Sequence, residues 1–103
     1  MHFLKMSGRV PAGKHKEFEQ TFKFVSNHMP PDCLQLSLSA DIFTPDLYHF
    51  YSLWPTAETL AGFYRSQEFQ LLAGAYKTLG SLEKNITGEV VDIKTFHITD
   101  MDN

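Results

Sequence analysis

At Trp54 the sequence changes abruptly from the pattern of a β-strand to that of an α-helix. In the run LYHFYSLW, which ends at Trp54, side chains alternate, and both alternating sets are largely apolar or aromatic. Such a strand is expected to be covered on both sides. Pro55 follows, and Thr56 is placed to cap a helix that reaches Tyr64. The chain must therefore join a buried strand to a helix at its only tryptophan.

The same two patterns, alternation along a strand and the 3.6-residue repeat of a helix, predict the other elements. Strands are expected at 2–10, 33–42 and 89–98, a helix before Pro30, a second helix between Ser66 and Gly80, and a looser link over 81–88. The order strand, helix, strand, strand, broken helix, strand is that of the ferredoxin-like α+β fold, βαββαβ, with a four-stranded antiparallel sheet. Its helices would cover one face only. Because the third strand is apolar on both sides, we expect a homodimer formed through the open sheet face.

Length and composition narrow the class of protein. The 103 residues suit one domain, 1–103, with its core at about 3–98. A net charge of −3 with no concentrated basic run argues against nucleic-acid binding. No segment approaches the ~20 apolar residues that span a bilayer, so no membrane association is expected. Cys33 is the only cysteine, which excludes an internal disulfide and favours a cytoplasmic location.

Polar residues give few candidates for chemistry. The five histidines are scattered, and no Cys/His cluster or helical i, i+4 pair occurs, so no metal site is expected. His49 and His97 fall on different predicted strands and could converge. No glycine motif for a phosphate or a dinucleotide is present.

Aromatic residues are the stronger signal, at 14% of the chain. They predict either a ring-filled core or an apolar pocket between the sheet and the helices, and the residues alone leave both open. Trp54 is the main candidate for the pocket wall, because it stands at a strand end before a short helix that contains Gly62, a junction that packs imperfectly. Its N–H also needs a partner if buried. The other candidate lining residues are Phe50, Phe63, Tyr64, Phe69 and Tyr76, with Tyr48 in the same aromatic group.

Over about residues 3–98 the chain resembles the antibiotic biosynthesis monooxygenase family. The resemblance is carried by PAGK and EFE at the first helix, CL opening the second strand, and Trp54 followed by the F and SQEF elements. It implies a dimeric α+β barrel that oxidises a small aromatic or quinol-like compound with O₂ and without a bound cofactor. Trp54 matches a tryptophan of the family's active cavity, but Phe50 and Leu60 replace the asparagine and tyrosine of its polyketide-type members.

The haem-degrading branch of that family is a poorer match. Met6, Phe63 and Ala73 stand where that branch has its asparagine, second tryptophan and haem-ligating histidine. Without the histidine the iron has no matching axial ligand, so no haem cofactor is expected.

The predicted function is therefore a cofactor-independent monooxygenase with a small hydrophobic or aromatic substrate. Trp54, His49 and His97 are its candidate catalytic residues. Two alternatives stay open: a non-catalytic, small-ligand-binding dimer on the same fold, and an isomerase of a lactone-type metabolite that would use His49 or His97 as general acid or base.

Overall fold

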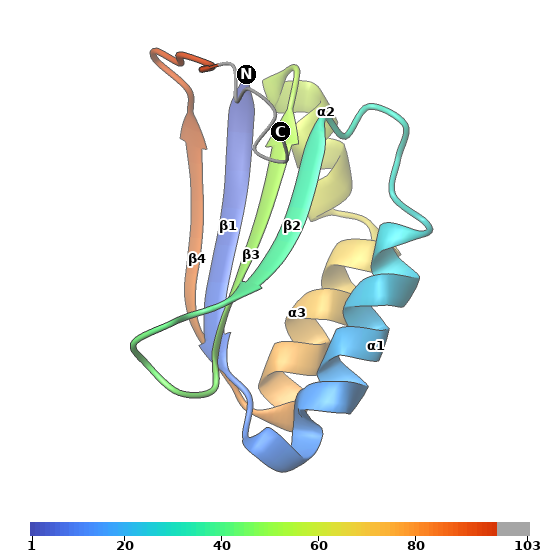
Figure 1. Cartoon of the computed structure of the whole chain (residues 1–103). Coiled ribbons are helices and arrows are strands. Elements are labelled where there is room, and N and C mark those ends of the chain that lie inside the picture. The colour runs from blue at the N-terminus through green and yellow to red at the C-terminus, as the bar shows by residue number, and fades with distance from the viewer. Residues whose placement is uncertain (97–103) are drawn as a thin grey trace, which may run out of the picture.

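A computed structural model describes residues 1–96 as a four-stranded sheet with helices on one face (Figure 1). In chain order the elements are β1 (His2–Arg9), α1 (His15–Ser26), β2 (Gln35–Ala40), β3 (Leu47–Trp54), α2 (Ala57–Tyr64), α3 (Gln67–Leu79) and β4 (Ser81–Glu89). A short 3₁₀ turn, Ala12–Lys14, leads into α1. The strand order is β2-β3-β1-β4, and every neighbouring pair is antiparallel. The predicted ferredoxin-like α+β arrangement is confirmed.

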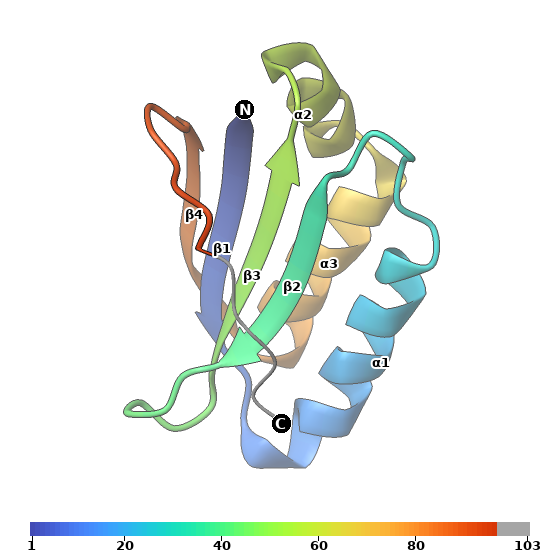
Figure 2. The same cartoon turned by 45° about the horizontal axis from the view of Figure 1, so that its top comes forward.

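The core lies between the sheet and the helices. On the helix-facing side of the central strands, Leu4 and Met6 of β1 and Phe50 and Trp54 of β3 are completely buried. α1 and α3 lie side by side behind the sheet, while α2 covers one end of it (Figure 2). On the opposite side of β3, His49 and Tyr51 are only half-buried. The sheet thus has one covered face and one open face.

Side-chain caps fix the two C-terminal helices where the sequence places them. Thr56 accepts a hydrogen bond from the backbone N–H of Thr59 at 3.1 Å, and the Thr59 hydroxyl lies 3.3 Å from the Thr56 N–H, which closes a capping box. Ser66 likewise accepts from the N–H of Phe69 at 3.1 Å. Both predicted helix starts are confirmed.

The chain turns from α3 into β4 through a close backbone contact at Gly80. A Cβ on Gly80 would lie 1.8 Å from the Arg9 carbonyl oxygen, so no other residue fits without movement of the backbone. The strand β4 therefore starts at the very next residue, Ser81, paired with Arg9.

The last strand is the main correction to the sequence-based expectations. The link predicted over 81–88 is strand β4. Of the strand predicted over 89–98, Glu89 is the last residue of β4, residues 90–96 have no regular structure, and residues 97 and 98 lie outside the described part of the chain. β4 carries mostly polar residues, and most of its side chains are exposed, since it is an edge strand of the sheet. Alternation of apolar and polar residues, the usual sign of a half-buried strand, is therefore missing.

Helix α1 ends at Ser26, before the prolines that were expected to terminate it. The Ser26 hydroxyl donates to the Lys23 carbonyl at 2.7 Å, and a His28 ring nitrogen bonds the Phe24 carbonyl at 2.8 Å. These side chains satisfy the last carbonyls of the helix, so it can stop before the prolines.

Candidate functional site

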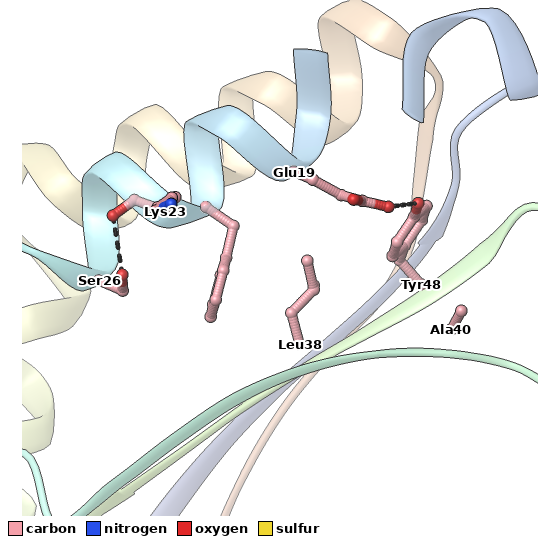
Figure 3. Close-up of a pocket in the computed structure, with 7 residues that line it drawn as sticks. Glu19, Lys23, Ser26, Leu38, Ala40 and Tyr48 are labelled. Carbon is pink, nitrogen blue, oxygen red and sulfur yellow. Dashed lines mark hydrogen bonds between the residues drawn. The ribbon is translucent and has the colours of Figure 1, made fainter. Parts of the chain in front are cut away.

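A groove of about 500 Å³ opens between α1 and the edge strand β2 (Figure 3). We call it the α1–β2 groove. Its lining residues are Glu19, Phe22, Lys23, Ser26, Leu38, Ala40 and Tyr48. The amphipathic period of α1 places Glu19, Phe22, Lys23 and Ser26 on the side that looks toward the sheet edge. The groove thus has an apolar middle with polar groups along its helix side.

Tyr48 ties β3 to α1 at one end of this groove. Its hydroxyl donates a hydrogen bond to the Glu19 carboxylate, seen as a dashed line in Figure 3. Its ring packs against Phe18 at 5.0 Å between centroids and meets the edge of His15 at 5.2 Å. Its backbone carbonyl accepts from the Tyr76 hydroxyl at 3.1 Å. Tyr48 is held from three directions, so its hydroxyl has a fixed position.

The electrostatics of this pair set what it can do. Burial, the hydrogen bond to Glu19 and the nearby carboxylate charges of Glu19 and Asp46 together hold the pKa of Tyr48 far above its usual range. The phenol therefore stays protonated and acts only as a hydrogen-bond donor near neutral pH. Glu19, which is exposed, is the acceptor of this hydrogen bond.

Lys23 and Ser26 occupy the other end of the α1–β2 groove. The Ser26 hydroxyl is engaged with the Lys23 backbone carbonyl at 2.7 Å. The Lys23 side chain is exposed and carries the only positive charge among the lining residues. Phe22 and Leu38, both partly buried against the core, form the apolar walls. This set suits a small flat molecule with one ionisable group.

Trp54 lies in the core and is not among the residues that line the α1–β2 groove. Its exposed fraction is 0%, and its ring stacks on Phe63 at 5.0 Å between centroids. The N–H that needed a partner donates to the Ser52 hydroxyl at 2.9 Å, and Ser52 is itself buried. The local structure explains why a buried serine interrupts the apolar strand β3.

Four of the other predicted aromatic residues form a chain of ring contacts that continues from Trp54. Between ring centroids, Phe63 lies 6.3 Å from Phe50 and 5.7 Å from Phe69, and Phe69 lies 4.5 Å from Tyr64. Tyr64, at the outer end, is 42% exposed. Tyr76 is buried separately against Phe18, at 4.6 Å. Phe50 does not line the groove, but its ring lies 6.2 Å from that of the groove-lining Phe22, measured between centroids, in a T-shaped contact.

His49 lies on the open face, on the side of β3 away from Trp54. Its Nδ1 is 2.8 Å from the Ser7 hydroxyl, and its Nε2 is 2.9 Å from an Asp41 carboxylate oxygen. The hydrogen bond from His49, followed by those from the N–H groups of Thr44 and Phe43, lowers the pKa of Asp41 to about 2. The fold thus separates His49 from Trp54 by the thickness of the sheet. His97 lies outside the described residues.

Within residues 1–96, no group of three or more His, Cys, Asp or Glu side chains is arranged to hold a metal ion. In the same part of the chain, the helices are all too short or too polar to cross a membrane.

Sequence reasoning missed the residues that shape the α1–β2 groove. Glu19 carries no signal in the sequence, because an acidic residue on an exposed helix side is common and its partner is 29 residues away. Tyr48 belongs to the aromatic group already noted, and its position one residue after the turn could have indicated a strand-start contact. The sequence pattern indicated only that Phe22 and Leu38 belong to the core.

By sequence alone, the chain matches no family model and no curated protein. Solved structures share its fold. A candidate antibiotic biosynthesis monooxygenase from Deinococcus radiodurans superposes with a TM-score of 0.78 at 15% identity, covering 94% of this chain and 99% of the other. Another from Chloroflexus aurantiacus gives a TM-score of 0.70 at 17% identity, covering 91% and 96%.

A conserved protein of unknown function from Bacteroides thetaiotaomicron gives a TM-score of 0.74 at 18% identity, covering 86% of this chain and 96% of that one. At such identities the likeness concerns the fold. The suspected resemblance to the antibiotic biosynthesis monooxygenases is supported at that level.

Proposed function

We propose that the chain is a cofactor-independent monooxygenase whose substrate, a small aromatic or quinol-like molecule, binds in the α1–β2 groove. The observation that carries the proposal is the Tyr48–Glu19 hydrogen bond at the end of an apolar groove. A neutral donor beside a proton acceptor is what a carbon acid or a phenol needs when it ionises. The shared fold with candidate monooxygenases supports the same reaction class.

In the proposed reaction Glu19 accepts a proton from an activated CH₂ or OH group of the substrate. Tyr48 then donates its hydrogen bond to the oxygen on which the negative charge develops. The electron-rich anion reduces O₂. For a CH₂ group the balance is CH₂ + O₂ → C=O + H₂O, so the carbon supplies all four electrons that O₂ takes up. The apolar walls, Phe22 and Leu38, hold the ring system and exclude water.

The test is O₂ uptake with a panel of anthrones and quinols, without added cofactor. We expect turnover of at least one compound, and a loss of about 100-fold in kcat for Glu19→Gln, the usual scale for a general base. Glu17→Gln on the same helix is the matched control, because Glu17 is exposed and does not line the groove. Uptake that survives Glu19→Gln unchanged would place the chemistry elsewhere.

Isomerisation of a lactone-type metabolite is a second candidate, because Glu19 can carry a proton from one carbon to another while Tyr48 donates a hydrogen bond to the developing enolate oxygen. Such a reaction needs no O₂, so product formation under nitrogen would select it. Compounds that bind to the groove but are never converted would instead favour the non-catalytic binding role.

We also infer a homodimer formed through the open sheet face. Phe3 and Tyr51 stack there at 6.2 Å between centroids, and Ile86 is 46% exposed beside them on the neighbouring strand β4. A second copy would cover these apolar groups. A cytoplasmic location stays a prediction from the single cysteine.

A further inference from the structure

A second groove lies at the opposite edge of the sheet, where α2 faces β4. Since β2 and β4 are the two edge strands, the sheet itself separates it from the α1–β2 groove (Figure 1). It consists of two hollows of about 300 Å³ and 290 Å³ that share Leu60 and Thr87. We call the pair the α2–β4 trough. Asn85 and Thr87 of β4 are exposed along it.

Hydrogen-bond donors gather at one end of the trough. That end is lined by Leu60, Ala61, Tyr64, Arg65, Asn85 and Thr87, and no acidic residue is among them. The Asn85 amide donates to the Tyr64 hydroxyl at 3.2 Å, which leaves the Tyr64 proton and the second amide proton available to a ligand. Within residues 1–96 no carboxylate lies within ion-pair distance of Arg65. This end of the trough thus carries one cation, and no carboxylate is among its lining residues.

The other end of the trough has a different character. It is lined by His2, Ala57, Leu60, Thr87, Gly88 and Glu89. The Nδ1 atom of His2 is buried and has no hydrogen-bond partner among the described residues. A buried ring nitrogen without a partner is costly, and a turn of the His2 ring toward the trough would let a ligand hydroxyl bond to it. Glu89 at this end disfavours a second negative charge on the ligand.

We propose that the α2–β4 trough binds a small organic monocarboxylate with a short apolar body. The carboxylate meets the Arg65 guanidinium, whose planar fork matches its geometry, together with the Tyr64 and Asn85 donors. The apolar body lies against Leu60 and Ala57. A hydroxyl at the far end of the body reaches His2, so a hydroxylated aromatic acid fits the whole trough.

The test uses 4-hydroxybenzoate and its neutral analogue 4-hydroxybenzamide, titrated into the ¹⁵N-labelled full chain and followed by NMR. We expect saturable chemical-shift changes at the backbone N–H groups of Tyr64, Arg65 and Asn85. The affinity for 4-hydroxybenzamide should be lower than that for 4-hydroxybenzoate by about tenfold or more. Arg65→Gln should weaken binding of the acid by a similar factor. Arg9→Gln is the control, because the Arg9 guanidinium already pairs with Glu83 at 3.0 Å near the other end of β4.

Equal affinities for the acid and the amide, wild-type affinity in Arg65→Gln, or shifts confined to the α1–β2 groove would each overturn the proposal. The His2 end has its own readout. His2→Ala should weaken binding of 4-hydroxybenzoate but not of benzoate, and equal effects on both would remove His2 from the site. Because the two grooves are separate, these outcomes do not depend on whether the chain is a monooxygenase.

Discussion

The Tyr48 hydroxyl donates a hydrogen bond to the Glu19 carboxylate, joining β3 to α1 at the end of the α1–β2 groove. A second tyrosine fixes the backbone of Tyr48, since the Tyr76 hydroxyl donates a hydrogen bond to the Tyr48 carbonyl at 3.1 Å. Both rings are buried, with exposed fractions of 4% and 0%. The two phenols are thus neutral donors fixed in the core.

This pair predicts a loss of stability at alkaline pH. Burial raises the pKa of both tyrosines in the folded state, so the folded chain keeps two protons that the unfolded chain releases above about pH 10. The free energy of unfolding should therefore fall as the pH rises, by up to about 2.7 kcal/mol per pH unit. Urea unfolding followed by Trp54 fluorescence measures it. Tyr76→Phe should halve the slope, and an unchanged slope would show that Tyr76 ionises in the folded state.

At acid pH the sensitive group is Asp41. Its pKa of about 2 lies below the ordinary value of 3.8, so its contribution to stability is complete above pH 4 and is lost as the pH falls toward 2. Asp41→Asn should remove this step from the plot of unfolding free energy against pH. His49→Gln should shift the step toward higher pH, because the hydrogen bond from His49 is the largest cause of the lowered pKa. A step of unchanged size in Asp41→Asn would assign it to another carboxyl group.

Two glycines should respond oppositely to alanine. A Cβ on Gly8 would lie 2.4 Å from the Ser81 carbonyl oxygen and 2.5 Å from the Tyr76 ring, so Gly8→Ala should cost about 1–3 kcal/mol. At Gly74, inside α3, nothing lies within 4 Å of an added Cβ. Gly74→Ala should therefore stabilise by about 0.5–1 kcal/mol through helix propensity. Thermal unfolding of both variants checks the pair, and destabilisation by Gly74→Ala would contradict the packing described for α3.

Trp54→Phe separates packing from ligand contact. The smaller ring leaves a void beside Phe63 and leaves the buried Ser52 hydroxyl without its donor, so we expect a loss of about 1–3 kcal/mol. Ligand affinity in the α1–β2 groove should stay at the wild-type value. Leu38→Trp should do the reverse, filling the groove and abolishing binding with little change in stability. If Trp54→Phe weakens binding in the folded protein, then Trp54 contacts the ligand, as the family resemblance implies.

The inferred dimer can be tested by substituting two exposed aliphatic residues. Ile86 on the open face and Leu71 on α3 are 46% and 45% exposed. Ile86→Lys should weaken dimerisation by tenfold or more, about 1.4 kcal/mol, because it buries a charge in the interface, whereas Leu71→Lys should not. Light scattering over a range of concentrations measures the effect. A wild-type chain that is monomeric throughout would exclude the dimer altogether.

Local signals in the sequence predicted most of the fold. Thr56, Ser66 and Gly80 mark helix ends by side-chain capping or by close backbone contact, and these effects act over a few residues. The strand β3 was predictable because its apolar set is buried against the helices. β4 was not, since its pairing with β1 depends on backbone hydrogen bonds that any polar sequence can make.

The candidate site was less predictable for the same reason. Glu19 and Tyr48 meet only because α1 packs across the edge of the sheet, and neither residue's neighbours in sequence reveal this. The family resemblance directed attention to Trp54, whose ring proves to be enclosed by Phe63 and Ser52. Sequence reasoning therefore identified the aromatic core, whereas the surfaces on either side of it required the structure.

The position of β1 has a consequence for how the chain acquires its structure. β1 is synthesised first, yet it lies between β3 and β4 and must wait for both partners to emerge. Until residues 81–89 are available, one side of β1 has open backbone groups that could pair with another chain. Two of the three strand pairings, β1 with β3 and β1 with β4, join distant parts of the sequence, so folding should be slower than that of a helical bundle of this size. A truncation that ends after α3 should expose that unpaired strand and aggregate.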